Sequence, residues 1–260
     1  MPNPGPPQIF SASRRAARLH RHVKAVSRED FENASAQFIR NDIADDLAER
    51  LSFMQREPSE ALIIGDPAGI VSGGLKSIGY STHQATLADI DEEKPYGIKV
   101  PLIISVCSLD TVNDLPGSLL HIRNALTEDG LFLASFTGFG SLPKLRQILM
   151  QADGDTPAAR LHPQIDTQAA SALMQRAGFT RQVVDSRSIN VAYRSFDRLL
   201  SDLRAQGLTN VLTDAPPAFT RSGRVRAERA FDDARDDHGR VVETFEIITV
   251  TGWNGGRRGL

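Results

Sequence analysis

A glycine turn is the chemical feature that stands out in this 260-residue sequence. The apolar residues 61–64 run into Gly65, Asp66 and Gly69, and a stretch with helical character follows. Glycines at such a turn let the backbone approach a ligand closely, and the start of the helix offers free N–H groups. The residues alone leave two interpretations open, a ligand-binding turn and a structural connection between a strand and a helix.

Four other polar residues could take part in binding or catalysis. Asp91 and Glu92 lie in an acidic loop, Asp110 follows an apolar stretch, and His162 precedes a proline. A carboxylate at position 110 could serve as a base or could simply face water. The six histidines show no metal-ligand spacing, so we expect no metal site.

Composition excludes several classes of protein. The 30 basic and 32 acidic side chains leave a net charge of −2, which gives no field to attract nucleic acid. The single cysteine, Cys107, excludes an internal disulfide and a cysteine-based zinc site. The apolar stretches are too short to span a bilayer, and the chain does not open on a secretory signal pattern. The sequence therefore predicts a cytoplasmic protein without a membrane span or a nucleic-acid partner.

Alternating strands and helices must position these residues. Short apolar strands are predicted at 61–64, 100–106 and 131–136, with helices at 67–78 and 116–126, and this alternation is typical of βαβ units. The predicted fold class is α/β, a Rossmann-like sheet that is mostly parallel, with an antiparallel C-terminal strand and helices on both faces. Further helices are predicted at 31–50, 141–151, 166–176, 196–206 and 222–236, and longer, alternating strands at 183–193 and 241–253.

This arrangement makes a specific prediction about neighbouring strands. Ile64, Ile104 and Leu133 should lie on adjacent or near-adjacent parallel strands. Ile248 should lie on an antiparallel strand of the same sheet. A separate domain for the C-terminal strand would contradict the predicted architecture.

A collinear series of motifs carries a resemblance to a known family. The series is Ser108-Leu-Asp-Thr-Val-Asn-Asp-Leu-Pro-Gly117, His121-Ile-Arg-Asn-Ala-Leu126, Glu128-Asp-Gly-Leu-Phe132, Arg176-Ala-Gly-Phe179 and Thr244-Phe-Glu-Ile-Ile248. With these motifs the chain resembles the class I S-adenosylmethionine-dependent methyltransferases over roughly residues 9–253. The branch that it resembles contains the malonyl-carrier-protein methyl-ester synthase of biotin synthesis and the methyltransferase-like assembly factor of respiratory complex I.

The resemblance implies a fold, a cofactor and a set of site residues. The family has a seven-stranded sheet and binds S-adenosylmethionine across the carboxyl ends of its first strands. Cofactor binding would then fall to Gly65, Asp66, Gly69, Asp91 and Glu92, and Asp110 and His162 would be weak catalytic candidates beside the acceptor. The methyl acceptor stays unidentified. It could be a small molecule, a carrier-protein-bound acyl group or a protein. The cofactor's methyl group is already electrophilic, so the protein has mainly to position the reactants.

The sequence departs from the family pattern at the turn and just after it. Ile63 stands where the family carries an acid that organises the cofactor, and Pro67 stands where it carries a glycine. Residues 80–90 leave room for one strand and not for a crossover helix. We therefore expect S-adenosylmethionine binding to be weak or lost. Two alternatives to an active enzyme stay open, a catalytically degenerate assembly or scaffold protein and an arginine-hydroxylase-like assembly factor of respiratory complex I.

The chain divides into four predicted parts. Residues 1–8, with four prolines, form a disordered tail, and residues 255–260 form a flexible one. Residues 57–254 form the methyltransferase-like domain, and residues 9–56 form a helical lid. The first lid helix, 11–28, carries six basic side chains and no acid. We expect it to dock near the cofactor mouth against the acids at 42–49 and 91–93, with a solvated helix or a free arm as the alternatives.

Overall fold

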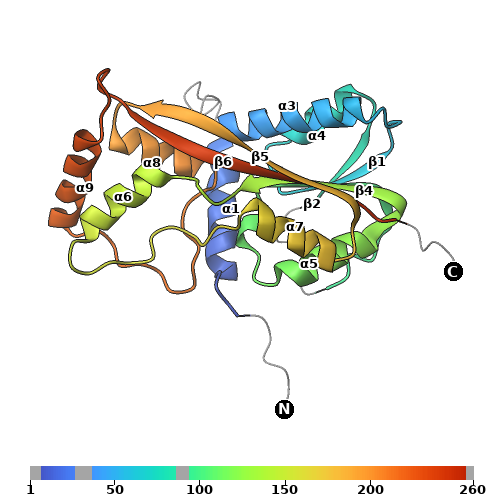
Figure 1. Cartoon of the computed structure of the whole chain (residues 1–260), viewed down its shortest axis with the longest axis horizontal. Coiled ribbons are helices and arrows are strands. Elements are labelled where there is room, and N and C mark those ends of the chain that lie inside the picture. The colour runs from blue at the N-terminus through green and yellow to red at the C-terminus, as the bar shows by residue number, and fades with distance from the viewer. Residues whose placement is uncertain (1–6, 27–36, 86–93, 256–260) are drawn as a thin grey trace, which may run out of the picture.

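One six-stranded sheet forms the centre of the computed structural model, which describes residues 7–26, 37–85 and 94–255 (Figure 1). Its strands are β1 (Glu60–Ile64), β2 (Ser81–Ala85), β3 (Val100–Val106), β4 (Leu126–Thr137), β5 (Thr180–Tyr193) and β6 (Val241–Trp253). They lie in the order β2-β1-β3-β4-β6-β5. The pairs among β1 to β4 are parallel, and β6 runs antiparallel between β4 and β5.

The predicted strand neighbours are confirmed. Ile64, Ile104 and Leu133 lie on β1, β3 and β4, which pair side by side and in parallel. Ile248 lies on β6 opposite Phe136 of β4, in an antiparallel pair of the same sheet. The α/β fold class with an antiparallel C-terminal strand is therefore correct. The strand β4 begins at Leu126, earlier than predicted, because Leu126 pairs with Val100 before an irregularity in the ladder.

Helices cover both faces of the sheet, as predicted. They are α1 (Ala12–Val26), α3 (Phe38–Phe53), α4 (Ile70–Ser77), α5 (Leu115–Ala125), α6 (Pro143–Asp153), α7 (Thr167–Arg176), α8 (Phe196–Ala205) and α9 (Arg221–Asp233). Ile63 and Ile104 belong to one buried cluster, which also includes residues of α3, α4, α6, α8 and α9. Leu62 and Ile103, one position away on the same strands, belong to a second cluster with α5 and α7. Successive side chains of a strand point to opposite faces, which explains this division.

The sheet differs from the seven-stranded sheet that the resemblance implies. In the described residues it has six strands, and β2 lies at its edge. The strand β2 ends at Ala85 and β3 begins at Val100, so only residues 86–99 connect them. A parallel crossover through a further strand and helix needs a much longer connection. The short crossover predicted from the sequence explains the smaller sheet.

The segment before α1 and α1 itself pack against the C-terminal half of the domain. Phe10 forms a β-bridge with Leu212 and is buried. On α1, Arg18 Nη2 donates to Thr111 Oγ1 at 3.0 Å, and His22 Nδ1 donates to the carbonyl of Ala205 at 2.5 Å. The helix therefore docks beside Thr111, in the segment that follows the carboxyl end of β3.

Removing residues 1–28 is expected to lower the melting temperature by several degrees. The truncation deletes a packed helix face, which costs about 1–3 kcal/mol. Differential scanning calorimetry of the full chain and of the truncated chain measures the shift. An unchanged melting curve would mean that α1 is a free arm in solution.

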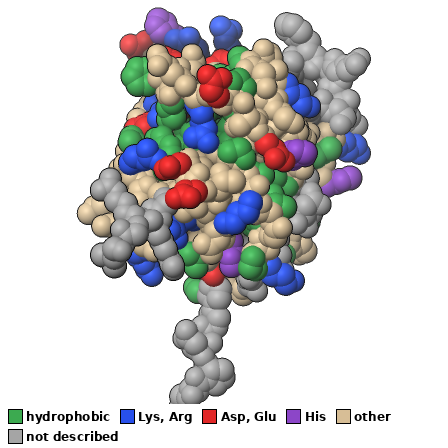
Figure 2. All heavy atoms as spheres, turned by 90° about the vertical axis from the view of Figure 1, so that its right-hand side faces the viewer, with side chains coloured by type: hydrophobic (Ala, Val, Ile, Leu, Met, Phe, Trp, Pro, Cys, Tyr) green, Lys and Arg blue, Asp and Glu red, His purple; other side chains and the backbone are tan. Residues whose placement is uncertain are grey.

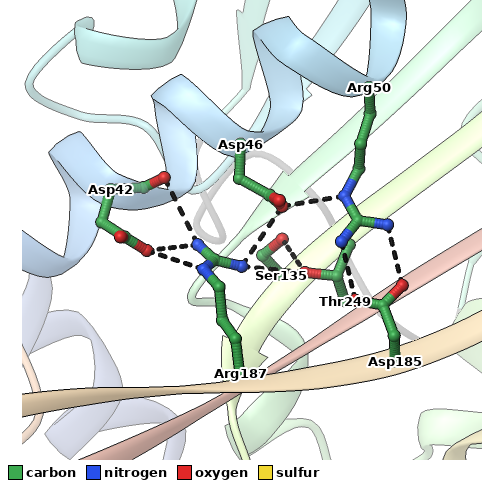
Figure 3. A network of polar contacts seen from close by, with 7 residues as sticks. All are labelled: Asp42, Asp46, Arg50, Ser135, Asp185, Arg187 and Thr249. Carbon is green, nitrogen blue, oxygen red and sulfur yellow. Dashed lines mark hydrogen bonds and ion pairs between the residues drawn. The ribbon is translucent and has the colours of Figure 1, made fainter. Parts of the chain in front are cut away.

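The prediction that acids at 42–49 pair with α1 is wrong for Asp42 and Asp46, which bind arginines of α3 and β5 instead (Figure 3). Asp42 and Asp46 of α3 both pair with Arg187 of β5, the latter at 3.2 Å. Arg50, also on α3, donates to Asp185 of β5 with Nη2 at 2.6 Å. Its hydrogen bonds to Asp185 and to Asp46 raise the pKa of Arg50. This network ties α3 to the sheet. The other expected acids, at 91–93, lie outside the described residues.

Charge is mixed on the molecular surface that Figure 2 draws. Acidic and basic side chains are interspersed there, in line with the net charge of −2. A mixed face produces no single-sign field. In the described ranges, no helix has the length and apolar character needed to cross a membrane.

Candidate functional site

The glycine turn, residues 65–69, connects β1 to α4. Gly65 and Gly69 both have positive φ angles, +82° and +69°. A Cβ atom on Gly65 would lie 2.3 Å from the carbonyl oxygen of Val106 on β3, whereas one on Gly69 would meet only Gln84 Nε2 at 3.4 Å. Gly65 is therefore needed for the close approach of β1 to β3, which by itself accounts for a glycine at this position. Gly69 faces the more open side of the turn.

Asp66 serves the helix that follows the turn. Its side chain is 3% exposed. Oδ1 accepts the N–H of Ile70 at 3.0 Å, and Oδ2 accepts the N–H and the hydroxyl of Ser72 at 2.8 and 2.9 Å. These contacts cap the first turn of α4. The carboxylate that the sequence offered as a substitute cofactor anchor is thus engaged within its own turn.

Arg40 is a site residue that the sequence analysis missed. It lies on α3, is 5% exposed, and donates from Nη1 to the carbonyl oxygen of Gly65 at 2.7 Å. The one available signal was its position, since it directly follows Phe38 and Ile39 on the apolar side of a predicted amphipathic helix. A charged residue within an apolar stripe is worth a functional hypothesis.

A cavity of about 300 Å³, here called the Asp110 pocket, lies past the carboxyl end of β3. It brings together the two catalytic candidates, Asp110 and His162. Its walls are otherwise mostly apolar and include Phe10, Val112 and Leu161. A largely apolar cavity with a few polar groups is the usual form of a small-ligand site. Asp91 and Glu92 lie outside the described residues, so their place relative to this pocket is not defined.

Asp110 lines this pocket and has one buried carboxylate oxygen. It lies in a short 3-10 helix, Leu109–Thr111, directly after β3. Its Oδ1 atom is buried and has no hydrogen-bond partner among the described residues. A buried carboxylate oxygen without a partner is costly, so it favours a ligand that brings a donor. In the same described ranges, no three His, Cys, Asp or Glu side chains converge as metal ligands would.

His162 is a neutral part of the pocket wall. Its Nε2 accepts the N–H of Val211 at 2.7 Å, which leaves the proton on Nδ1. The ring of Phe10 packs edge-on against it at 5.4 Å. Burial lowers the pKa of His162 to about 4, and the charges of Arg18 and Arg14 act in the same direction. The imidazole can therefore donate a hydrogen bond from Nδ1 at neutral pH, but it cannot act as a cationic acid.

The most specific motif of the resemblance has a structural role. Asn113 Oδ1 accepts the N–H of Phe10 at 2.8 Å, and Asn113 Nδ2 donates to the carbonyl of Phe10 at 2.9 Å. Asp114 caps α5 by accepting the N–H of Gly117 at 2.9 Å. The pair thus holds the N-terminal segment over the pocket and starts the next helix. Asp114 and Gly117 are three positions apart, so this cap depends on local sequence, whereas Asn113 binds a residue 103 positions away.

Comparisons with known proteins confirm the resemblance that the motifs predict. The chain is 26% identical to a malonyl-[acyl-carrier protein] O-methyltransferase of Halorhodospira halophila, over 98% of this chain and 92% of that protein. A protein of the same name from Laribacter hongkongensis is 24% identical over 88% and 89%. No family model matches the chain.

A second group of relatives is similar over a shorter stretch. The mitochondrial arginine-hydroxylase NDUFAF5 of the mouse is 30% identical over 58% of this chain and 46% of its own length. The chain spans about half the length of such relatives. Among solved structures, the [4+2]-cyclase SpnF is 13% identical, with a TM-score of 0.49 over 98% of this chain and 100% of its own. Both named groups of relatives are those of the predicted branch, so the chain is related to that branch of the class I methyltransferases.

Proposed function

We propose that this methyltransferase-like protein transfers a methyl group to an acceptor that enters the Asp110 pocket. Relatives named as carrier-protein O-methyltransferases match it over nearly the whole chain, which makes a carrier-protein-bound acyl group the first acceptor to test. The observation that carries the proposal is the Asp110 pocket, an apolar cavity with one unpartnered carboxylate oxygen at the carboxyl edge of the sheet. Ligands of open α/β sheets bind at that edge.

S-adenosylmethionine is the cofactor that this function implies, and the glycine turn fits it only in part. When bound, it supplies an electrophilic methyl group. Its ammonium and sulfonium groups need acceptors, but Arg40 already occupies the Gly65 carbonyl and Asp66 caps α4. Ile63 contributes none. We therefore propose that the cofactor binds weakly.

The chain's own residues have two tasks in this proposal. The pocket wall holds the acceptor, and the Asp110 carboxylate accepts a hydrogen bond from it, which orients the attacking atom. Of the predicted lid, residues 9–56, only Phe10 and α1 have this role in the proposal, because they cover the pocket side of the domain, whereas α3 packs into the core. The cytoplasmic location stays a prediction.

A second function is favoured by the contacts of the turn. The Gly65 carbonyl and the Asp66 carboxylate are both engaged by the chain itself, so neither needs a cofactor as its hydrogen-bond partner. A catalytically degenerate protein that assembles or holds a partner would need only the folded chain and no bound cofactor. The name of the mouse relative adds arginine hydroxylation as a further activity to examine.

Methyl transfer tests the first proposal. The protein is incubated with methyl-labelled S-adenosylmethionine and a malonyl carrier protein, and label on the carrier protein is measured. We expect transfer by the wild type and a loss of about tenfold or more in Leu161→Trp, whose indole fills the pocket. Leu200→Trp, at a half-buried leucine of α8 away from the pocket lining, is the matched control. Transfer that is unaffected by Leu161→Trp would contradict the acceptor site, and absence of transfer by the wild type favours the scaffold.

A further inference from the structure

The edge strand β5 has unused backbone groups. It is 14 residues long, and among the described residues it pairs only with β6. The pairing is regular from Val183 to Tyr193, and in the described ranges no backbone hydrogen bond reaches this stretch from any other segment. Proteins usually protect such an edge with a short strand, a proline, a lysine or a bulge, but this stretch contains neither proline nor lysine. Its outward N–H and C=O groups can therefore pair with a further strand.

The charges on β5 match those of an antiparallel copy of the same strand. Asp185 and Arg187 both point toward α3, and their side chains keep 39% and 27% of their exposure (Figure 3). With a two-fold axis at Ser186, each copy's Asp185 lies opposite the other copy's Arg187. Opposite charges that face each other across two strands are stabilising, and like charges are destabilising. An axis one residue to either side would place Asp185 or Arg187 opposite itself, so the charges favour one register.

The uncharged side chains match in the same register. Val183 is 52% exposed and lies opposite Ile189 of the second copy, which makes a pair of β-branched side chains. On the other face, Gln182 lies opposite Asn190 of the second copy. Val183 also borders a groove between α3 and the sheet, beside Phe53, which is 88% exposed. Exposed apolar side chains that gather in this way are typical of a contact surface.

We propose that β5 pairs antiparallel with β5 of a second copy of this chain, with the two-fold axis at Ser186, so that two six-stranded sheets form one continuous sheet. A two-fold interface uses the same surface twice and must therefore be self-complementary. The charges and apolar side chains of β5 meet that condition. A strand of an unrelated protein would find the backbone groups but not the reciprocal charges. The proposal is independent of the proposed function, because neither a cofactor nor a methyl acceptor takes part.

Sedimentation of the full chain tests the proposal. We expect the wild type to sediment at twice the 28.4 kDa of one chain. Ser186 is exposed, so Ser186→Lys and Ser186→Asp leave the core intact but each place two like charges at the axis. Each variant alone should raise the dissociation constant of the dimer by about tenfold or more, and an equimolar mixture should restore the dimer, because lysine then faces aspartate. Ser201→Lys, at an exposed position of α8, is the matched control and should sediment as the wild type does.

Disulfide cross-linking tests the register and does not depend on the charged variants. Directly opposite Cβ atoms lie about 4.5–5.5 Å apart, so Ser186→Cys should give a covalent dimer under mild oxidation. The two copies of Asn190→Cys would be more than about 20 Å apart and should not cross-link. The wild type, which keeps Cys107, gives the background. A wild type that stays monomeric at tens of micromolar overturns the proposal. A dimer that is unaffected by Ser186→Lys, or that cross-links through Asn190→Cys as well as through Ser186→Cys, overturns it as well.

Discussion

Replacing Gly65 by alanine is expected to destabilise the protein by about 3 kcal/mol or more. The new Cβ would lie 2.3 Å from the Val106 carbonyl oxygen and 3.1 Å from Ser108 Cβ, so β1 and β3 would have to separate. The positive φ of +82° adds the strain of a left-handed conformation, about 1–2 kcal/mol for a residue with a side chain. Urea unfolding of the variant and the wild type measures the difference.

Gly69→Ala is the matched control for this effect. It shares the positive φ, at +69°, but its Cβ would meet only the flexible amide of Gln84 at 3.4 Å. We expect a cost of about 1 kcal/mol from the backbone strain alone. Equal costs at the two glycines would contradict the close contact between β1 and β3.

Acid should weaken the protein through its buried histidines. The folded-state pKa of His22 is about 4, below the ordinary 6.5, and burial is the main cause. Between these values the unfolded chain binds a proton that the folded chain does not. Stability therefore falls as the pH drops from about 6.5 to 4, by about 3 kcal/mol for His22. His162, with the same folded pKa, acts in the same direction.

A variant isolates the contribution of His22. His22→Gln can still donate to the carbonyl of Ala205 but does not titrate, so its unfolding free energy should depend less on pH over this range. His238→Gln, at an exposed position, is the control and should keep the wild-type slope. Urea unfolding at about pH 7, 5.5 and 4.5 gives the three curves. An unchanged slope in His22→Gln would show that His22 is not buried neutral in solution.

The sheet could be predicted from the sequence because each strand has a distinct pattern. Continuous apolar runs at β1 and β3 indicate strands buried on both faces, and the alternation along β5 indicates a half-exposed one. The helix cap at Asp114 is equally local, because Asp114 binds an N–H three residues ahead. These features depend on residues that are close together in the sequence, so they can be predicted from the sequence of a single chain.

The site could be predicted only in part, because its contacts join distant residues. Gly65 is visible as a glycine, but the strand backbone that requires it is 41 positions away. Asp66 has the right chemistry for a cofactor anchor, yet a serine six residues on uses its oxygens. Arg40 reaches the turn from a helix 25 positions earlier. Spacing shows which groups are present, and packing decides which of them stay available to a ligand.

Calorimetric titration of the full chain with S-adenosylmethionine tests the central claim most directly. The claim is that a methyltransferase-like fold retains its glycine turn while the anchors for the cofactor's cationic groups are absent or engaged. Two lost charge-assisted hydrogen bonds of about 1.5–3 kcal/mol each weaken binding by about a hundredfold or more. We predict a dissociation constant well above micromolar, or no detectable heat. A sub-micromolar dissociation constant would contradict the account and would show that the turn offers acceptors to the cofactor after all.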